Sequence, residues 1–224
     1  MAYRRHEFAP DEWYHCYSRG VDKRRVFTNT ADYERFLQGL YLSNDTQAIT
    51  RGNFQHRSHT DILRLPRTKA LVLIGAYSLM PNHFHLLLKE LEPGGVTKFM
   101  HKLGTGYTMY FNAKYERVGN LFVKPFRSRH IGDDRYFKRV AQYIHLNPAE
   151  LFESEWKKGS VKSISKLEAS LRTYRYGSFV EYCGQTRPET TIIDKDAMDL
   201  LRSDAPKINQ ILNEALAYYR DLPS

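Results

Sequence analysis

The chain has little cysteine and no long apolar run. Its only two cysteines, Cys16 and Cys183, lie far apart, which argues against a disulfide framework and against a zinc site built from closely spaced thiolates. No stretch approaches the roughly 18 apolar residues that a membrane-spanning helix requires. The polar, arginine-containing first ten residues do not resemble a signal peptide. These absences predict a cytoplasmic protein without a membrane partner.

Basic residues outnumber acidic ones by 34 to 25, which gives a formal charge of +9 and a pI near 9.4. The excess lies in residues 1–187, because residues 188–224 hold seven acids and only four bases. With 42% hydrophobic residues the chain can still bury a substantial core. This charge balance points to a polyanionic partner, and it favours nucleic acid over a membrane surface.

Apolar periodicity and chain-breaking residues predict an alternation of strands and helices. We expect strands over 13–18, 70–78, 83–89 and 121–130, and helices over 30–41, 96–111, 134–146, 194–201 and 208–219. The second and third strands form either a hairpin or one long bent strand. Residues 43–68 are polar and interrupted, so we expect an insertion or loop there, with at most a short strand near Ile62.

Two histidines interrupt the apolar segment Met80–Leu88. Because side chains alternate along a strand, His83 and His85 should project from one face and Phe84 from the other. Two imidazoles side by side supply part of a metal site. The alternative is a pair of buried core histidines whose nitrogens are satisfied by backbone groups.

A second pattern lies in the segment Tyr143–Pro148, at the end of a predicted helix. Tyr143 and Asn147 are four residues apart and therefore share a helix face. The Asn147 amide oxygen could complete a site begun by His83 and His85, and this donor set suits Mg²⁺ or Mn²⁺. Tyr143 would hold a phenol nearby, which becomes a useful nucleophile when a metal polarises a phosphate. The alternatives are a core tyrosine and a helix-capping asparagine.

Four segments carry a resemblance to a known family: Tyr14–Gly20, Met80–Leu88, Leu121–Ser128 and Tyr143–Pro148. Together they resemble the REP-associated tyrosine transposases, single-tyrosine HUH nucleases related to the small insertion-sequence transposases. The resemblance spans roughly residues 10–180. It implies an α+β fold, with a ferredoxin-like antiparallel sheet backed by helices and a small helical C-terminal extension. We expect the transposase domain over residues 1–160 and the extension, packed on the core, over 161–224.

The family's chemistry transfers to the matching residues. The resemblance implies that His83, His85 and Asn147 bind the divalent cation, Mg²⁺ or Mn²⁺. It also implies that Tyr143 attacks a phosphodiester of single-stranded DNA, leaving a 5′-phosphotyrosine link and a free 3′-hydroxyl. The family acts on hairpin-forming repeated extragenic palindromic DNA.

Phosphate contacts are expected from basic residues of the matched segments and their surroundings. The candidates are Arg19, Lys23, Arg24, Arg25, Lys124, Arg127 and Arg129. Phe122 and Phe126 are candidates for base stacking, with burial in the core as the alternative.

One alternative is a non-catalytic single-stranded nucleic-acid-binding protein on the same fold. It would need the basic surface but not Tyr143. A replication or conjugation initiator fits less well, because the chain has no room for a helicase. Either a monomer or a homodimer is compatible with the sequence.

Overall fold

The computed structural model describes residues 7–47, 56–202 and 208–220. Four strands form one antiparallel sheet in the order β2–β3–β1–β4. The main elements up to the end of the sheet are β1 (Trp13–Arg19), α1 (Thr30–Leu42), β2 (Val72–Met80), β3 (His83–Glu90), α3 (Gly95–Lys114) and β4 (Arg127–Ile131). This order of strands and helices is that of a ferredoxin-like sheet, so the predicted fold class is confirmed.

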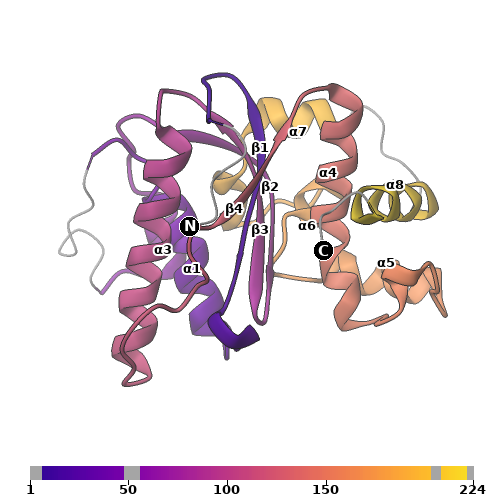
Figure 1. Cartoon of the computed structure of the whole chain (residues 1–224), viewed down its shortest axis with the longest axis horizontal. Coiled ribbons are helices and arrows are strands. Elements are labelled where there is room, and N and C mark those ends of the chain that lie inside the picture. Colours follow the sequence, from indigo (N-terminus) through magenta and orange to yellow (C-terminus); the bar gives the residue numbers. More distant parts are fainter. Residues whose placement is uncertain (1–6, 48–55, 203–207, 221–224) are drawn as a thin grey trace.

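Helices cover both faces of the sheet (Figure 1). Helices α1 and α3 lie on one face, and α4 (Asp134–Leu146) and α8 (Ile208–Arg220) lie on the other. Alternation along β1 divides its side chains between two cores. Tyr14 and Cys16 belong to the core under α1 and α3. Trp13 packs against Phe137 of α4 in the second core.

A two-residue turn joins β2 to β3, which confirms the hairpin rather than one bent strand. Proline suits the second position of such a turn because its φ is already fixed. The carbonyl of Pro81 accepts hydrogen bonds from the backbone of Val26 and Phe27, and that of Asn82 accepts one from Gly20. The turn is therefore fastened to the segment that follows β1.

Helix α4 begins and ends where its sequence indicates. The side chain of Asp133 accepts a hydrogen bond from the backbone of Tyr136, which satisfies one of the free amides at the helix start. Pro148 has no amide hydrogen to donate, and the chain continues after Leu146 as the short 3-10 helix η3 (Asn147–Leu151). Asn147 thus occupies the junction between the two helices.

Two expectations for local structure are wrong. Only residues 127–130 of the predicted strand 121–130 belong to the sheet, as part of β4 (Arg127–Ile131), while Phe122 forms an isolated bridge with Gly20 and is buried. Near Ile62 the chain forms a short helix, α2 (His59–Ile62), because the Ser58 side chain caps its first turn. Residues 48–55 of the expected insertion lie outside the described residues.

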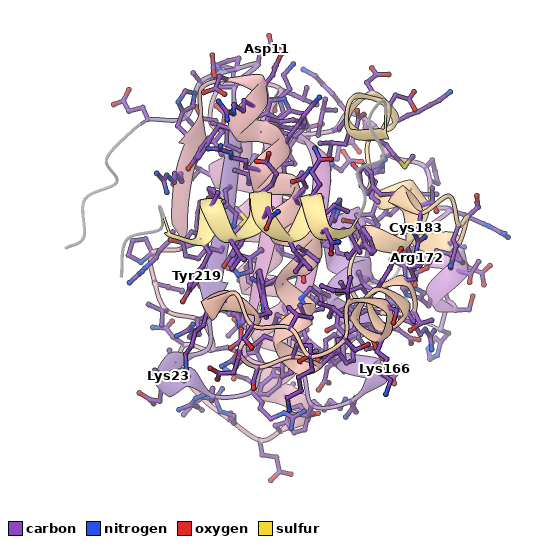
Figure 2. The ribbon with its side chains drawn as sticks, turned by 90° about the vertical axis from the view of Figure 1, so that its right-hand side faces the viewer. Asp11, Lys23, Lys166, Arg172, Cys183 and Tyr219 are labelled. Carbon is purple, nitrogen blue, oxygen red and sulfur yellow. The ribbon has the colours of Figure 1, made fainter. Side chains whose placement is uncertain are left out.

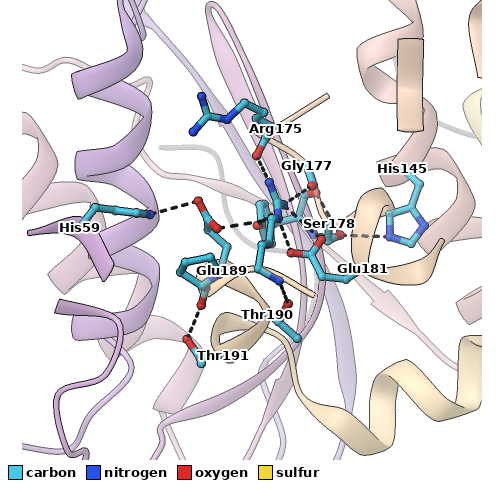
Figure 3. Close-up of polar contacts among 12 residues, drawn as sticks. His59, His145, Arg175, Gly177, Ser178, Glu181, Glu189, Thr190 and Thr191 are labelled. Carbon is cyan, nitrogen blue, oxygen red and sulfur yellow. Dashed lines mark hydrogen bonds and ion pairs between the residues drawn. The ribbon is translucent and has the colours of Figure 1, made fainter. Parts of the chain in front are cut away.

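The rest of the chain folds back onto this core. A largely buried arginine, Arg187, forms an ion pair with Glu181 and donates to the carbonyl of Gly177 and to the phenol of Tyr77 (Figure 3). Gly177 also bridges Ser78 of β2. The remaining helices are η1 (Val21–Lys23), η4 (Trp156–Lys158), α5 (Ile164–Arg172), α6 (Phe179–Tyr182), η5 (Pro188–Ile192) and α7 (Lys195–Arg202). Within the described ranges, no helix combines the length and apolarity needed to cross a membrane.

Candidate active site

β3 carries both predicted histidine ligands on one face of the sheet. The ring centroids of His83 and His85 are 5.1 Å apart, and the ring planes are nearly perpendicular. Phe84, between them, points to the opposite face and packs against Phe36 of α1. The histidine pair therefore lies on the face that α4 and α8 cover (Figure 1).

Asn147 meets His83 across the space between α4 and the sheet. The Asn147 Oδ1 is 3.0 Å from His83 Nε2, and the other ring nitrogen, Nδ1, is 2.6 Å from the Oδ1 of Asn82. Burial lowers the pKa of His83 to about 4, so at neutral pH the ring has one N–H for two amide oxygens. A metal-bound histidine commonly donates its other N–H to such an oxygen. Donation to Asn82 leaves Nε2 free to bind a cation.

The donor set fits a hard divalent cation. Imidazole nitrogens and an amide oxygen are donors that such a cation can accept, and His83 Nε2 and Asn147 Oδ1 lie 3.0 Å apart. Asn147 is fully buried, and its Nδ2 has no hydrogen-bond partner within the described part of the chain. No three His, Cys, Asp or Glu side chains are grouped for metal binding among the described residues. Asn147 thus offers an amide oxygen beside His83.

Tyr143 lies one turn before Asn147, against the second histidine. Its ring centroid is 5.4 Å from that of His85, with the rings edge to face. Only 3% of Tyr143 is exposed, because Tyr218 and Tyr219 of α8 pack over it at 5.0 and 6.4 Å. This burial raises the pKa of the phenol above its usual value, and the side chain of Asn147 partly opposes the rise. Tyr143 is therefore a neutral phenol until something stabilises its anion.

Positive charge from the 3-10 helix η4 also approaches the site. Lys157 contributes to lowering the pKa of both His83 and His85, after the larger effect of burial. Its ammonium group lies 5.3 Å from the ring centroid of Tyr219 and forms an ion pair with Glu150. Sequence reasoning did not select Lys157, because the polar segment around it has no regular pattern.

Three further aromatic residues of the site were also not predicted. Tyr17 and His15 are neighbours of His85 on the same face of the sheet, and Tyr17 stacks on both imidazoles. His15 is fully buried and contacts the Nδ1 of His85 through its Nε2. Tyr218 reaches the other nitrogen of His15 from α8. The alternation of Trp13, His15 and Tyr17 was the available signal, but it does not reveal which strand lies alongside.

Two of the basic residues predicted to bind DNA project from the face that holds the histidines. Arg19 pairs with His83 in the register of β1 and β3, and Arg127 lies opposite Tyr17. Both are exposed. Arg129 shares this face but is partly buried, with its guanidinium 5.7 Å from the ring centroid of Tyr218. Arg129 is thus also part of the packing between β4 and α8.

The other predicted basic residues lie close to the end of β1. Lys23 and Arg25 are exposed, whereas Arg24 forms an ion pair with Asp22. Figure 2 shows Tyr219 beside α8 and Lys23 lower down, at the edge of the molecule. Lys124 is exposed next to Val123, whose amide donates to the carbonyl of Arg19. The chain therefore gathers these cations around the end of β1 that adjoins His83.

The two candidate stacking residues are not equivalent. Phe122 is 6% exposed and packs against Phe84 and Tyr107, so base stacking by Phe122 is not compatible with this structure. Phe126 is partly exposed and stacks on Phe8 with a centroid distance of 6.2 Å. His145, between Tyr143 and Asn147, points away from the histidine pair and contacts Ser178 (Figure 3).

Comparison with known proteins gives a matching family and a similar fold. Residues 42–147 match the model of the family described as IS200-like transposases, and this segment contains both histidines, Tyr143 and Asn147. No curated protein matches the chain significantly. A solved structure, a REP-associated tyrosine transposase bound to a REP hairpin, has a similar fold, with a TM-score of 0.51 and 14% identity over 84% of this chain and 90% of that one. The sequence match and the shared fold together confirm the predicted resemblance to the IS200-like and REP-associated tyrosine transposases.

Proposed function

We propose that the protein is a metal-dependent single-stranded DNA endonuclease and strand transferase with Tyr143 as its nucleophile. The observation that carries the proposal is the 3.0 Å contact between His83 Nε2 and Asn147 Oδ1, one helical turn from a phenol that lies against His85. The family match supports a transposase that acts on DNA. The buried, convergent donors support a metal centre more than they support an inert core.

His83, His85 and Asn147 are the proposed ligands of one Mg²⁺ or Mn²⁺ ion. When bound, the ion would polarise a phosphate oxygen and offset the negative charge that builds up at phosphorus. Two asparagines position the donors of this site. Asn82 fixes the ring of His83 by accepting its Nδ1–H, and Asn147 presents its oxygen from the end of α4.

Tyr143 would perform the covalent step. Its phenol loses the proton, the Oη forms a bond to phosphorus, and the bond from phosphorus to the 3′-oxygen breaks. The departing 3′-oxygen takes up a proton, and the downstream strand stays attached as a 5′-phosphotyrosine. Attack by a 3′-hydroxyl on this ester reverses the step and rejoins the strand. Since Tyr143 is covered by Tyr218 and Tyr219, the substrate must displace part of this cover.

We propose hairpin-forming repeated extragenic palindromic DNA as the substrate. The structural relative is bound to a REP hairpin, and the cations around the end of β1 offer phosphate contacts beside the histidines. Exposed Arg19 and Arg127 would contact the backbone closest to the metal site. The partly exposed ring of Tyr17 offers a surface for a base. The cytoplasmic location and the oligomeric state stay predictions.

The decisive experiment is capture of the covalent intermediate. The full chain is incubated with Mn²⁺ and a single-stranded REP hairpin labelled at either end, and the products are separated under denaturing conditions. We expect a protein–DNA adduct with the 3′-labelled strand, because the downstream fragment carries the 5′-phosphate, and none with the 5′-labelled strand. Tyr143→Phe should form no adduct, while His83→Ala should lose the adduct and keep hairpin affinity.

Tyr219→Phe is the matched control, because it removes the hydroxyl of a neighbouring tyrosine that is 38% exposed. It should still form the adduct. Adduct formation by Tyr143→Phe, or loss of the adduct in Tyr219→Phe alone, would show that a residue other than Tyr143 is the nucleophile. Hairpin binding by the wild-type chain without any adduct would instead favour the non-catalytic nucleic-acid-binding protein.

A further inference from the structure

A chain of hydrogen bonds leads away from the second proposed ligand into the core. The Nδ1 of His85 is 2.8 Å from the Nε2 of His15, and the Nδ1 of His15 is 2.6 Å from the Oη of Tyr218. His15 is fully buried, His85 is 5% exposed, and Tyr218 is fully buried. These hydrogen bonds connect β3, β1 and α8. The proposed cleavage step uses neither His15 nor Tyr218.

The tautomer of each imidazole follows from its contacts. A histidine binds a metal as the neutral ring, through the nitrogen that carries no hydrogen. A neutral imidazole has one N–H, which sits on either Nδ1 or Nε2. Each contact in the chain must therefore have one donor and one acceptor.

The two possible donor–acceptor directions of these hydrogen bonds have different consequences for His85. If His85 Nδ1–H donates to His15, then His15 Nδ1–H donates to the Tyr218 oxygen, and His85 Nε2 keeps a free lone pair. If Tyr218 donates to His15 instead, then His15 donates to His85, and the proton of His85 is forced onto Nε2. Only the first direction leaves His85 able to bind a metal through Nε2.

We propose that His15 and Tyr218 are positioning residues that hold His85 in the tautomer and orientation required of a metal ligand. The inference rests on the proposed metal centre and deepens it. Tyr218 can accept the hydrogen bond from His15 because a phenol oxygen accepts as well as donates. Tyr17 adds a second restraint, since its ring stacks on both imidazoles, at 4.8 Å from His15 and 5.4 Å from His85. The orientation of one ligand thus depends on a strand and a helix that carry no ligand themselves.

Metal binding by the full chain, measured without DNA, tests the inference separately from cleavage. Mn²⁺ affinity is measured by calorimetry for the wild type, His85→Ala, His15→Leu, His15→Gln and Tyr218→Phe. Loss of such an outer hydrogen bond typically weakens metal binding by about 10-fold to 100-fold, which we expect for His15→Leu and Tyr218→Phe. His15→Gln should stay within a few-fold of the wild type, because the Gln carbonyl can replace His15 Nε2 as the acceptor.

Two controls separate positioning from general damage to the fold. Tyr219→Phe removes the hydroxyl of the next residue on α8, and it should bind Mn²⁺ like the wild type. Hairpin affinity in the presence of chelator should be the same in all variants, which shows that they are folded. In ¹⁵N-histidine-labelled protein, the His85 Nδ1–H form should dominate in the wild type, and the Nε2–H form should increase in Tyr218→Phe.

Wild-type Mn²⁺ affinity in folded His15→Leu, together with weak binding in His85→Ala, would overturn the inference and leave the proposed metal centre intact. Weakened binding in His15→Leu would support the inference even if the wild type formed no DNA adduct. If the wild type bound Mn²⁺ no better than His85→Ala, both the metal centre and the inference would be wrong.

Discussion

At the scale of the residue, the basic side chains of the candidate DNA surface differ in how exposed they are. Arg127 is exposed opposite Tyr17, whereas Arg129 lies over the rings of Tyr136 and Tyr218. An exposed arginine is free to replace counterions on a phosphate. A stacked arginine also stabilises the elements that it joins.

We therefore expect Arg127→Ala to weaken hairpin binding equally for different sequences. The slope of the logarithm of the binding constant against the logarithm of salt concentration should become shallower by about 0.7–0.9, the amount for one lost phosphate contact. Fluorescence anisotropy at several salt concentrations measures this slope. Arg139→Ala is the control, since Arg139 is paired with Glu214 on α4 and α8, and its slope should not change. A slope for Arg127→Ala equal to that of the wild type would remove Arg127 from the DNA surface.

The residues of the candidate site fall into a predictable and an unpredictable group. Alternation along a strand was enough to place His83 and His85 on one face, and helix periodicity was enough to place Tyr143 beside Asn147. His15 and Tyr218 are 203 positions apart and meet through strand register and the docking of α8. Alternation along β1 gives the face of His15 but not its neighbours, and no local pattern links Tyr218 to the site, so sequence reasoning missed both.

At the scale of the element, the turn between β2 and β3 depends on a close approach at Gly20. A Cβ at this position would lie 2.4 Å from the carbonyl oxygen of Arg24 and 2.8 Å from a methyl group of Val26. Both neighbours belong to the segment that carries basic residues and fastens the turn. The glycine is required here for space.

Gly20→Ala should therefore lower the free energy of unfolding by about 1–3 kcal/mol, the usual cost of overpacking. Gly104→Ala is the matched variant, because Gly104 lies inside α3 with open space around its Cβ position. It should raise the free energy of unfolding by about 0.5–1 kcal/mol, through the better helix propensity of alanine. Urea denaturation monitored by circular dichroism compares the two. Equal effects from both substitutions would contradict the role of space at Gly20.

The predicted elements failed where tertiary contacts outweigh local pattern. Leu121–Phe126 has the apolar character of a strand, yet Phe122 pairs with Gly20 only as an isolated bridge. The apolar character of this segment reflects burial of Leu121 and Phe122 against α1 and α3 rather than sheet pairing. At Ile62 the capping serine, Ser58, outweighed the β-branched residue. The division between a transposase domain and an extension at residue 160 stays a prediction.

At the scale of the whole molecule, the protein buries several histidines whose pKa is lowered, so that they stay neutral in mildly acidic solution. Burial is the largest cause in each case, and it lowers the pKa to about 3 for His15 and His145, to about 4 for His83, and well below the usual value for His85. In the unfolded chain these rings take up protons near pH 6.5. The unfolded state therefore binds more protons than the folded state at mildly acidic pH, and acid favours unfolding.

With chelator present, stability should be greatest above about pH 6.5 and should fall steadily as the pH decreases toward 4. Scanning calorimetry at half-unit pH steps measures the melting temperature across this window. In His145→Leu the melting temperature should fall less steeply as the pH decreases, because one of the buried histidines with a lowered pKa is absent. Replacing the exposed His101 by Gln is the control, because it removes a histidine that does not belong to the buried set. A melting temperature that stays constant from pH 6.5 to 4.5 would contradict the burial of neutral histidines.

The 203-residue separation of His15 and Tyr218 also has a consequence for biosynthesis. During translation, β1 and β3 leave the ribosome long before α8, so the face that carries the proposed metal ligands is made first, without the helix that supplies Tyr218. A nascent chain of about 150 residues would already carry Tyr143 and all three proposed ligands, but His85 would lack the terminal phenol of its hydrogen-bond chain. The proposed metal centre would thus reach its full metal affinity only after α8 has been synthesised and has docked on the sheet.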